Sequence, residues 1–264
     1  MDATTTATTT PIEAPRAPTP SGGWAAIDGL LRDRPALLAR IERGEDLLGL
    51  VRSLALTLAA TTAVVGATIG AFRGGAQIAF AAVKLPLVVG LTAALCTPAY
   101  SALTAAIRGR TDLRKDVAVV LASLALSGLL LSALAPVILL GVFVQLSYHK
   151  LALLFTGACF LAGAGGLSLF VQAERRRAGA GSKTVLLVLL ATFAAVGSQV
   201  AWTLRPYLVR PRAPEVPFVR AVEGSLAEAV LYSSRSALGL YRRGRAPLPG
   251  EPGAGRFKPV AEPE

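Results

Sequence analysis

The residues that could do chemistry in this sequence are few, and none has partners at catalytic spacing. His149 is the only histidine, and it has no acidic or nucleophilic partner at a spacing typical of a catalytic set. Cys96 and Cys159 fall in apolar runs, with no second Cys or His at metal-ligand spacing, so we interpret them as small hydrophobic residues in packed helices. The sequence therefore predicts no catalytic centre, no metal site and no cofactor, and we expect a protein that is not an enzyme.

The strongest polar side chains near the apolar runs are three glutamines, Gln145, Gln172 and Gln199. We expect each of them to hydrogen-bond a neighbouring helix rather than a substrate. Proton- and ion-coupled transporters usually carry an ionisable residue at mid-membrane, and no apolar run here has one in its middle third. A transporter or channel subunit is therefore only our second interpretation of the function.

Long stretches without charge predict the helices that must position these residues. The run from 85 to 107 is 23 residues long and has no charged side chain. In hydrocarbon, every backbone N–H and C=O must be paired within the segment, and about 20 helical residues cross a bilayer core of roughly 30 Å. We expect this run to be a transmembrane helix.

Other runs of the same kind predict a transmembrane bundle over residues 54–204. The charge-free run from 117 to 147 is too long for one crossing, and Pro136 divides it, so a sixth, shorter span after a hairpin remains an alternative. We predict about five spans, at approximately 54–72, 85–107, 117–135, 151–171 and 184–204.

The flanks of the predicted bundle are more polar. Residues 24–53 alternate apolar and charged positions at helical spacing, which predicts amphipathic helices, either on the membrane face or folded onto the spans. Residues 205–241 predict a juxtamembrane segment with a further amphipathic helix, and the tails 1–23 and 242–264 have compositions typical of disorder. The predicted fold class is all-α, a polytopic helical membrane bundle with N-terminal and C-terminal amphipathic helices.

Gly66, Gly70 and Gly74 follow one another at intervals of four residues. This spacing places them in one stripe of a helix, where the lack of side chains lets a second helix approach closely. We predict that the stripe is a helix-packing face, within the bundle or between subunits.

Composition and charge limit the partners. Hydrophobic residues make up 53% of the chain and charged residues 16%, well below the roughly 25% of ordinary soluble domains. The net charge of +11 comes from basic residues between the apolar runs and in the tails, so we expect contact with lipid headgroups and not with nucleic acid. The bundle itself implies the lipid bilayer as partner, and a membrane protein partner or a homo-oligomer remains open.

The side of the membrane follows from the basic residues near the span ends. With five spans, 13 Lys and Arg lie on the side of the N-terminus and 7 on the other side, and the positive-inside rule places the N-terminus in the cytoplasm. The bias toward Arg, Ala and Leu is typical of GC-rich bacterial codons, so we expect a bacterial inner membrane.

Four residues at predicted span ends have the character of interfacial anchors. Lys84 opens the second span beside Pro86, and Trp202, Arg205 and Tyr207 close the fifth. Long basic side chains reach headgroups from such positions, and aromatic rings favour the interface. Lys84 and Arg205 would lie on the same side, so a shared pocket for an anionic lipid or a partner's carboxylate is the alternative.

The sequence resembles a group of small bacterial membrane proteins similar in layout to the Yip (Ypt-interacting) family, over about residues 30–230. The motifs that carry the resemblance are Lys84-Leu85-Pro86, the run from Leu91 to Tyr100, the Leu134-Ala135-Pro136 step and the closing Gln199-Val200-Ala201-Trp202-Thr203-Leu204-Arg205-Pro206-Tyr207. Here Val209-Arg210-Pro211 stands where the pattern usually has a glycine-containing turn. The resemblance implies a five-span bundle with a cytoplasmic N-terminus, and membrane organisation or partner binding rather than catalysis. We therefore expect a non-enzymatic membrane scaffold or adaptor.

Overall fold

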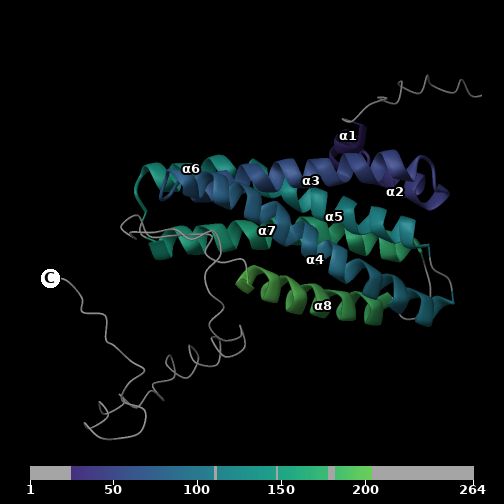
Figure 1. Cartoon of the computed structure of the whole chain (residues 1–264). Helices are drawn as coiled ribbons and strands as arrows, with labels where there is room; N and C mark the ends of the chain where they lie inside the picture. Colours follow the sequence, from purple (N-terminus) through teal and green to yellow (C-terminus); the bar gives the residue numbers. More distant parts are fainter. Residues whose placement is uncertain (1–24, 110–111, 147, 178–181, 204–264) are drawn as a thin grey trace, which may run out of the picture.

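The computed structural model describes residues 25–109, 112–146, 148–177 and 182–203, and within these ranges the regular structure is entirely helical (Figure 1). The eight helices of the described residues are α1 (Ala25–Arg32), α2 (Arg34–Arg43), α3 (Leu47–Gly70), α4 (Ala76–Arg108), α5 (Leu113–Ala133), α6 (Ala135–Phe143), α7 (Tyr148–Arg176) and α8 (Ser182–Thr203). The segments predicted at 1–23, 205–241 and 242–264 lie outside the described residues.

Five helical segments of the described chain are long and apolar enough to cross a membrane, so the protein is a polytopic helical bundle. They are Leu47–Gly70, Ala76–Ile107, Leu113–Phe143, Lys150–Arg176 and Lys183–Ala201. The outer faces of these helices carry large apolar side chains, such as Leu56, Leu153 and Phe160, each more than 70% exposed. In a bilayer these side chains would contact lipid.

The first two spans are longer than the charge-free runs predicted. α3 begins at Leu47 rather than at 54, because the Asp46 side chain accepts a hydrogen bond from Gly49 N and caps the helix before Arg52. α4 begins at Ala76 rather than at 85, so the apolar residues before Lys84 belong to the same helix as the predicted span. Charge-free runs underestimated both helices because a single charged residue does not end a helix.

The third apolar run is interrupted at Leu134, one residue before α6 and two before Pro136. Proline has no N–H to continue the helical hydrogen bonds, and it is well tolerated in a first turn, which is where Pro136 stands in α6. α6 has nine residues, a length of about 13 Å. It is therefore too short to be a sixth span.

Close contacts between the spans define their order. α3 and α4 form an antiparallel pair, in which Gly66 faces Ala81 and Gly70 faces Gln77. α5 lies beside α3, with Gly128 against Thr61. α7 packs on the opposite side of α5, and α8 packs mainly on α4, at the edge of the bundle (Figure 1).

α1 and α2 fold onto one end of this bundle. Asp33 accepts a hydrogen bond from Ala36 N at 2.9 Å and starts α2, with Pro35 in its first turn, and Gly44 ends α2 at φ +78°. Leu30, Leu38 and Ile41 are buried in one apolar cluster with residues of α3 and α5. Of the two arrangements predicted for residues 24–53, the structure shows helices folded onto the spans.

The glycine stripe is divided by the end of α3. A Cβ atom on Gly66 would lie 2.2 Å from Ala81 O, and one on Gly70 would lie 2.5 Å from Gln77 O, so both glycines let the α4 backbone approach. Gly74 follows the helix at φ +81°, and a Cβ atom added there would have no neighbouring atom within 4 Å. Gly66 and Gly70 thus pack within the bundle, and Gly74 forms part of the turn before α4.

We predict that Gly70→Ala and Gly70→Leu lower the free energy of unfolding, by about 1–3 kcal/mol for Ala and more for Leu, because the α3 and α4 backbones must separate. The measurement is thermal unfolding and size-exclusion chromatography in detergent. Gly90→Leu is the matched control, since Gly90 lies in α4 with open space around it. Equal melting temperatures for the Gly70 and Gly90 variants would contradict the packing role.

Candidate functional site: a buried ion network at the charged end of the bundle

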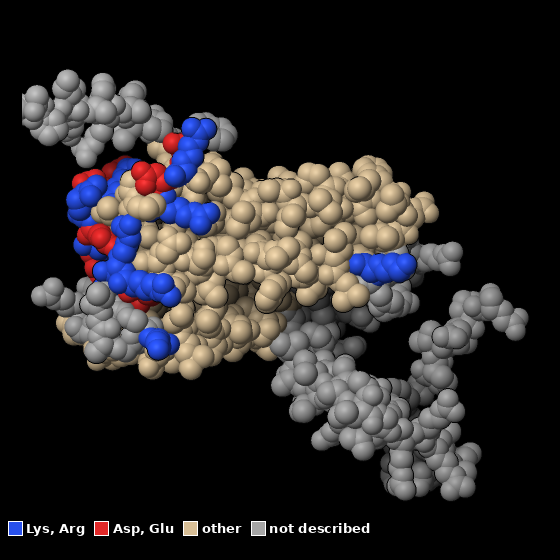
Figure 2. All heavy atoms as spheres, turned by 180° about the vertical axis from the view of Figure 1, so that it is seen from behind, with Lys and Arg blue, Asp and Glu red and all other residues tan. Residues whose placement is uncertain are grey.

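Charged side chains gather at one end of the bundle, at the left in Figure 2. This end is formed by α1, α2, the start of α3, the α4–α5 connection, the start of α5, the end of α7 and the start of α8, and every Asp and Glu of the described residues lies here. The long sides between the ends are almost free of charge (Figure 2). We call this region the charged end.

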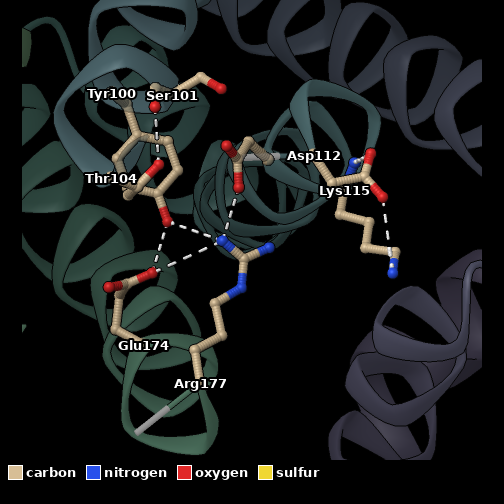
Figure 3. Close-up of polar contacts among 8 residues, drawn as sticks. Tyr100, Ser101, Thr104, Asp112, Lys115, Glu174 and Arg177 are labelled. Carbon is tan, nitrogen blue, oxygen red and sulfur yellow. Dashed lines mark hydrogen bonds and ion pairs between the residues drawn. The ribbon is translucent and has the colours of Figure 1, made fainter. Parts of the chain in front are cut away.

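Four side chains of the charged end meet inside the bundle: Tyr100 from α4, Asp116 from the first turn of α5, Glu174 from the last turn of α7, and Arg177 directly after α7. Figure 3 shows Tyr100, Glu174 and Arg177 pointing toward one another. α7 places Glu174 and Arg177 three residues apart, which is the spacing at which two side chains share one helix face. The ring of Phe170, one turn earlier on α7, meets the Tyr100 ring edge to face at a centroid distance of 5.3 Å.

Arg177 is the centre of this ion network. Its Nη1 atom donates to Asp116 Oδ1 at 2.6 Å and to the Tyr100 hydroxyl oxygen at 3.1 Å, and it lies 3.8 Å from Glu174 Oε1. The Tyr100 hydroxyl donates to Glu174 Oε1. One guanidinium thereby joins α4, α5 and α7.

The network is withdrawn from solvent. Tyr100, Asp116 and Glu174 are 2–3% exposed, and the Arg177 side chain is 18% exposed. Burial alone would lower the pKa of Arg177, but Tyr100, Asp116 and Glu174 around the guanidinium raise that pKa above its ordinary value. Arg177 therefore stays charged in every accessible pH range.

One carboxyl oxygen of the ion network has no hydrogen-bond partner. Asp116 Oδ1 accepts a hydrogen bond from Arg177, whereas Asp116 Oδ2 is buried without a hydrogen-bond partner in the described part of the chain. Chemically, the site can clamp three helices, and it contains one buried acceptor atom that the clamp does not use.

A second contact fastens α2 to the end of α7. Arg176 Nη1 donates to Pro35 O at 3.0 Å, next to the Arg177 network. The N-terminal helices therefore contact the same turn of α7 that carries the ion network.

Two of the four predicted anchor residues, Lys84 and Trp202, lie within the described residues. Lys84 lies in the ninth position of α4 and is fully buried in the protein, so it does not stand at the helix end where the anchoring prediction placed it. Trp202 lies in the last turn of α8, and Arg205 and Tyr207 lie outside the described residues, as does the shared Lys84–Arg205 pocket.

Sequence analysis missed the ion network, because Glu174 and Arg177 belong to a run of charged residues that resembles a solvated loop. A signal was present: Phe170, Ala173, Glu174 and Arg177 continue the apolar face of α7 at helical spacing. The Asp116 and Tyr100 partners come from two other helices, and no sequence spacing links them.

Comparisons with protein-family models, with curated proteins and with solved structures give no match to this chain.

We predict that Arg177→Gln lowers the free energy of unfolding by roughly 3 kcal/mol, because the buried Asp116 carboxylate then loses its ion-pair partner. Chemical denaturation in detergent at neutral pH measures the loss. Arg175→Gln, at an exposed neighbouring position, is the control, and equal stabilities of the two variants at neutral pH would exclude the clamp.

Proposed function

We propose that this protein is a non-enzymatic scaffold or adaptor of a bacterial inner membrane, which holds a membrane protein partner at the face next to its N-terminal helices. The observation that carries the proposal is the charged end: two short helices fixed on five apolar spans, with charged and apolar side chains on the outside. A surface of this kind can bind a partner without a conformational change.

The exposed groups of the charged end are suited to a protein partner. Leu31, Leu48 and Leu113 are 51–63% exposed there. Glu42 and Arg52 are exposed between them and form no ion pair with other described residues. Exposed leucines beside unpaired charges of both signs supply the apolar contacts and the charge pairs that protein interfaces combine.

The surface is also held in place. Arg40 pairs with Asp46 at 3.2 Å, and Arg43 pairs with Glu45 at 2.5 Å, across the turn between α2 and α3. Below this turn, Leu38 and Ile41 are buried on the spans. A surface that is already ordered loses little conformational entropy when a partner binds.

The same end carries the excess of basic residues, which supports a cytoplasmic N-terminus. The Yip-like layout of the sequence points in the same direction, by analogy of architecture.

A transporter subunit is the second candidate, and the buried carboxyl group of Asp116 favours it. A buried carboxyl oxygen without a hydrogen-bond partner, Asp116 Oδ2, could accept a transported proton or cation. Flux through proteoliposomes containing this protein alone, abolished by Asp116→Asn, would support the transporter and overturn the scaffold.

For the topology, we predict that a single cysteine introduced as Glu45→Cys reacts with an impermeant thiol reagent only from the cytoplasm, and one introduced as Lys150→Cys only from the other side. Both positions are exposed, at opposite ends of the bundle. Cys96 and Cys159 are replaced by Ala beforehand. The opposite labelling pattern would invert the proposed orientation.

For the partner, we predict that a photoreactive amino acid at position 48 gives one discrete cross-linked protein in living cells, while one at the exposed position 144, at the other end, does not. The double change Glu42→Lys and Arg52→Glu should abolish the cross-link, because it reverses both unpaired charges. Lys150→Glu, a charge reversal at the opposite end, should leave it unchanged. Loss of the cross-link in both charge variants, or cross-links of equal strength at 48 and 144, would refute a partner site at the charged end.

A further inference from the structure

A groove runs along the side of the bundle between α7 and α8, with α5 as its floor. Its volume is about 270 Å³. Ser123 and Leu124 of α5 line the floor, Gly163 and Phe170 of α7 line one wall, and Leu189 and Phe193 of α8 line the other.

The groove exists because α7 and α8 each pack on a different neighbour. Gly165 and Gly166 bring α7 onto α5, where a Cβ on Gly166 would lie 2.4 Å from Ser123 O. α8 instead packs on α4, with Gly197 against Thr92 and the Cys96 Sγ atom 3.9 Å from Thr192 O. Of the apolar residues with which α8 would cross a membrane, only 11% are buried inside the protein. This is the lowest share among the five candidate spans of the described chain.

The lining of the groove accepts hydrocarbon and offers little to a polar ligand. The hydroxyl groups of its two serines donate within α5, Ser123 to Val119 O at 2.9 Å and Ser127 to Ser123 O at 3.2 Å. The remaining lining is aliphatic, aromatic or glycine. Leu190 lines the groove and is 40% exposed, on a helix surface that would contact lipid, so a lipid chain can enter from the side.

Two exposed cations lie beyond one end of the groove. Arg175 follows Phe170 on α7 by five residues, about 8 Å along the helix, and Lys183 precedes Leu189 on α8 by six residues, about 9 Å. Both belong to the charged end, and neither takes part in the ion network around Arg177. An apolar groove that ends below two cations matches an acyl chain attached to a phosphate headgroup.

We propose that the groove between α7 and α8 binds an acyl chain of an anionic phospholipid from the leaflet at the charged end, and that Arg175 and Lys183 contact its phosphate. This inference stands apart from the proposed scaffold function, since it requires no protein partner.

The test uses native mass spectrometry of the full chain in detergent, titrated with dioleoylphosphatidylglycerol or with dioleoylphosphatidylcholine. Gly163→Leu fills the groove without a backbone clash, because a Cβ at Gly163 has no atom within 4 Å. Gly157→Leu is the matched control: Gly157 is also exposed on α7 with open space around it, and it does not line the groove. Both changes replace glycine by a better helix former, so neither should weaken α7.

We expect the wild-type chain to retain one phosphatidylglycerol in preference to phosphatidylcholine. Gly163→Leu should reduce the affinity for that lipid roughly tenfold or more, since the acyl chain loses its site, and Gly157→Leu should not. Arg175→Gln and Lys183→Gln should each weaken the preference for phosphatidylglycerol roughly fivefold, and Lys150→Gln, at the opposite end, should not.

The location is checked with phosphatidylglycerol that carries a photoreactive acyl chain. Adducts on α5, α7 and α8 residues of the groove support the proposal. Adducts spread evenly over the lipid-facing helix surfaces would overturn it, as would unchanged lipid retention in Gly163→Leu. A stable dimer of wild type that Gly163→Leu dissociates would assign the groove to a second copy of the chain instead.

Discussion

A single guanidinium joins three of the five spans. Arg177 bonds to Asp116 and Tyr100 and lies beside Glu174, so α4, α5 and α7 are tied together at the point where they leave the apolar part of the bundle. Between apolar helices in lipid there is no hydrophobic driving force, because lipid tails are as apolar as the helix surfaces. Ion pairs and hydrogen bonds therefore add to the close packing of the helices, and here they join three helices at one end of the bundle.

The rest of the charged end depends on this arrangement. The last turn of α7 carries both the network and Arg176, which holds α2 through Pro35 O. α1 and α2 in turn bury leucine and isoleucine side chains on α3 and α5. The exposed surface proposed to bind a partner therefore rests on the same turn of α7 that closes the bundle. The other end contains apolar clusters around Val65 and Ile138.

Much of the fold could be predicted from the sequence, because hydrocarbon demands long charge-free helices and such runs are easy to recognise. The number of candidate spans follows from that demand, and so does the break near Pro136. The errors on Lys84 and on the ion network have one physical cause: the prediction assumed that every charged residue contacts water or lipid headgroups. Lys84 is instead buried within α4, and Glu174 and Arg177 continue the buried face of α7. Whether a charge faces solvent or a partner is decided by other helices, and the sequence of one helix does not contain that information. Gly66 and Gly70 could be assigned to a packing face from spacing alone, whereas Gly74 could not be separated from them, since the same spacing continues past the end of α3.

The buried position of Lys84 bears on how the chain enters a bilayer. A lysine side chain in a membrane helix costs about 2.5–3.5 kcal/mol at the helix centre and less toward the ends. α4 alone would present this group to lipid, whereas in the bundle the Lys84 side chain is enclosed by protein. Three residues before it, Ala81 lies against Gly66 of α3. Insertion of α3 and α4 as one helical hairpin would shield the lysine from lipid during membrane integration. The contact between these two neighbouring helices would then favour their insertion together rather than one after the other.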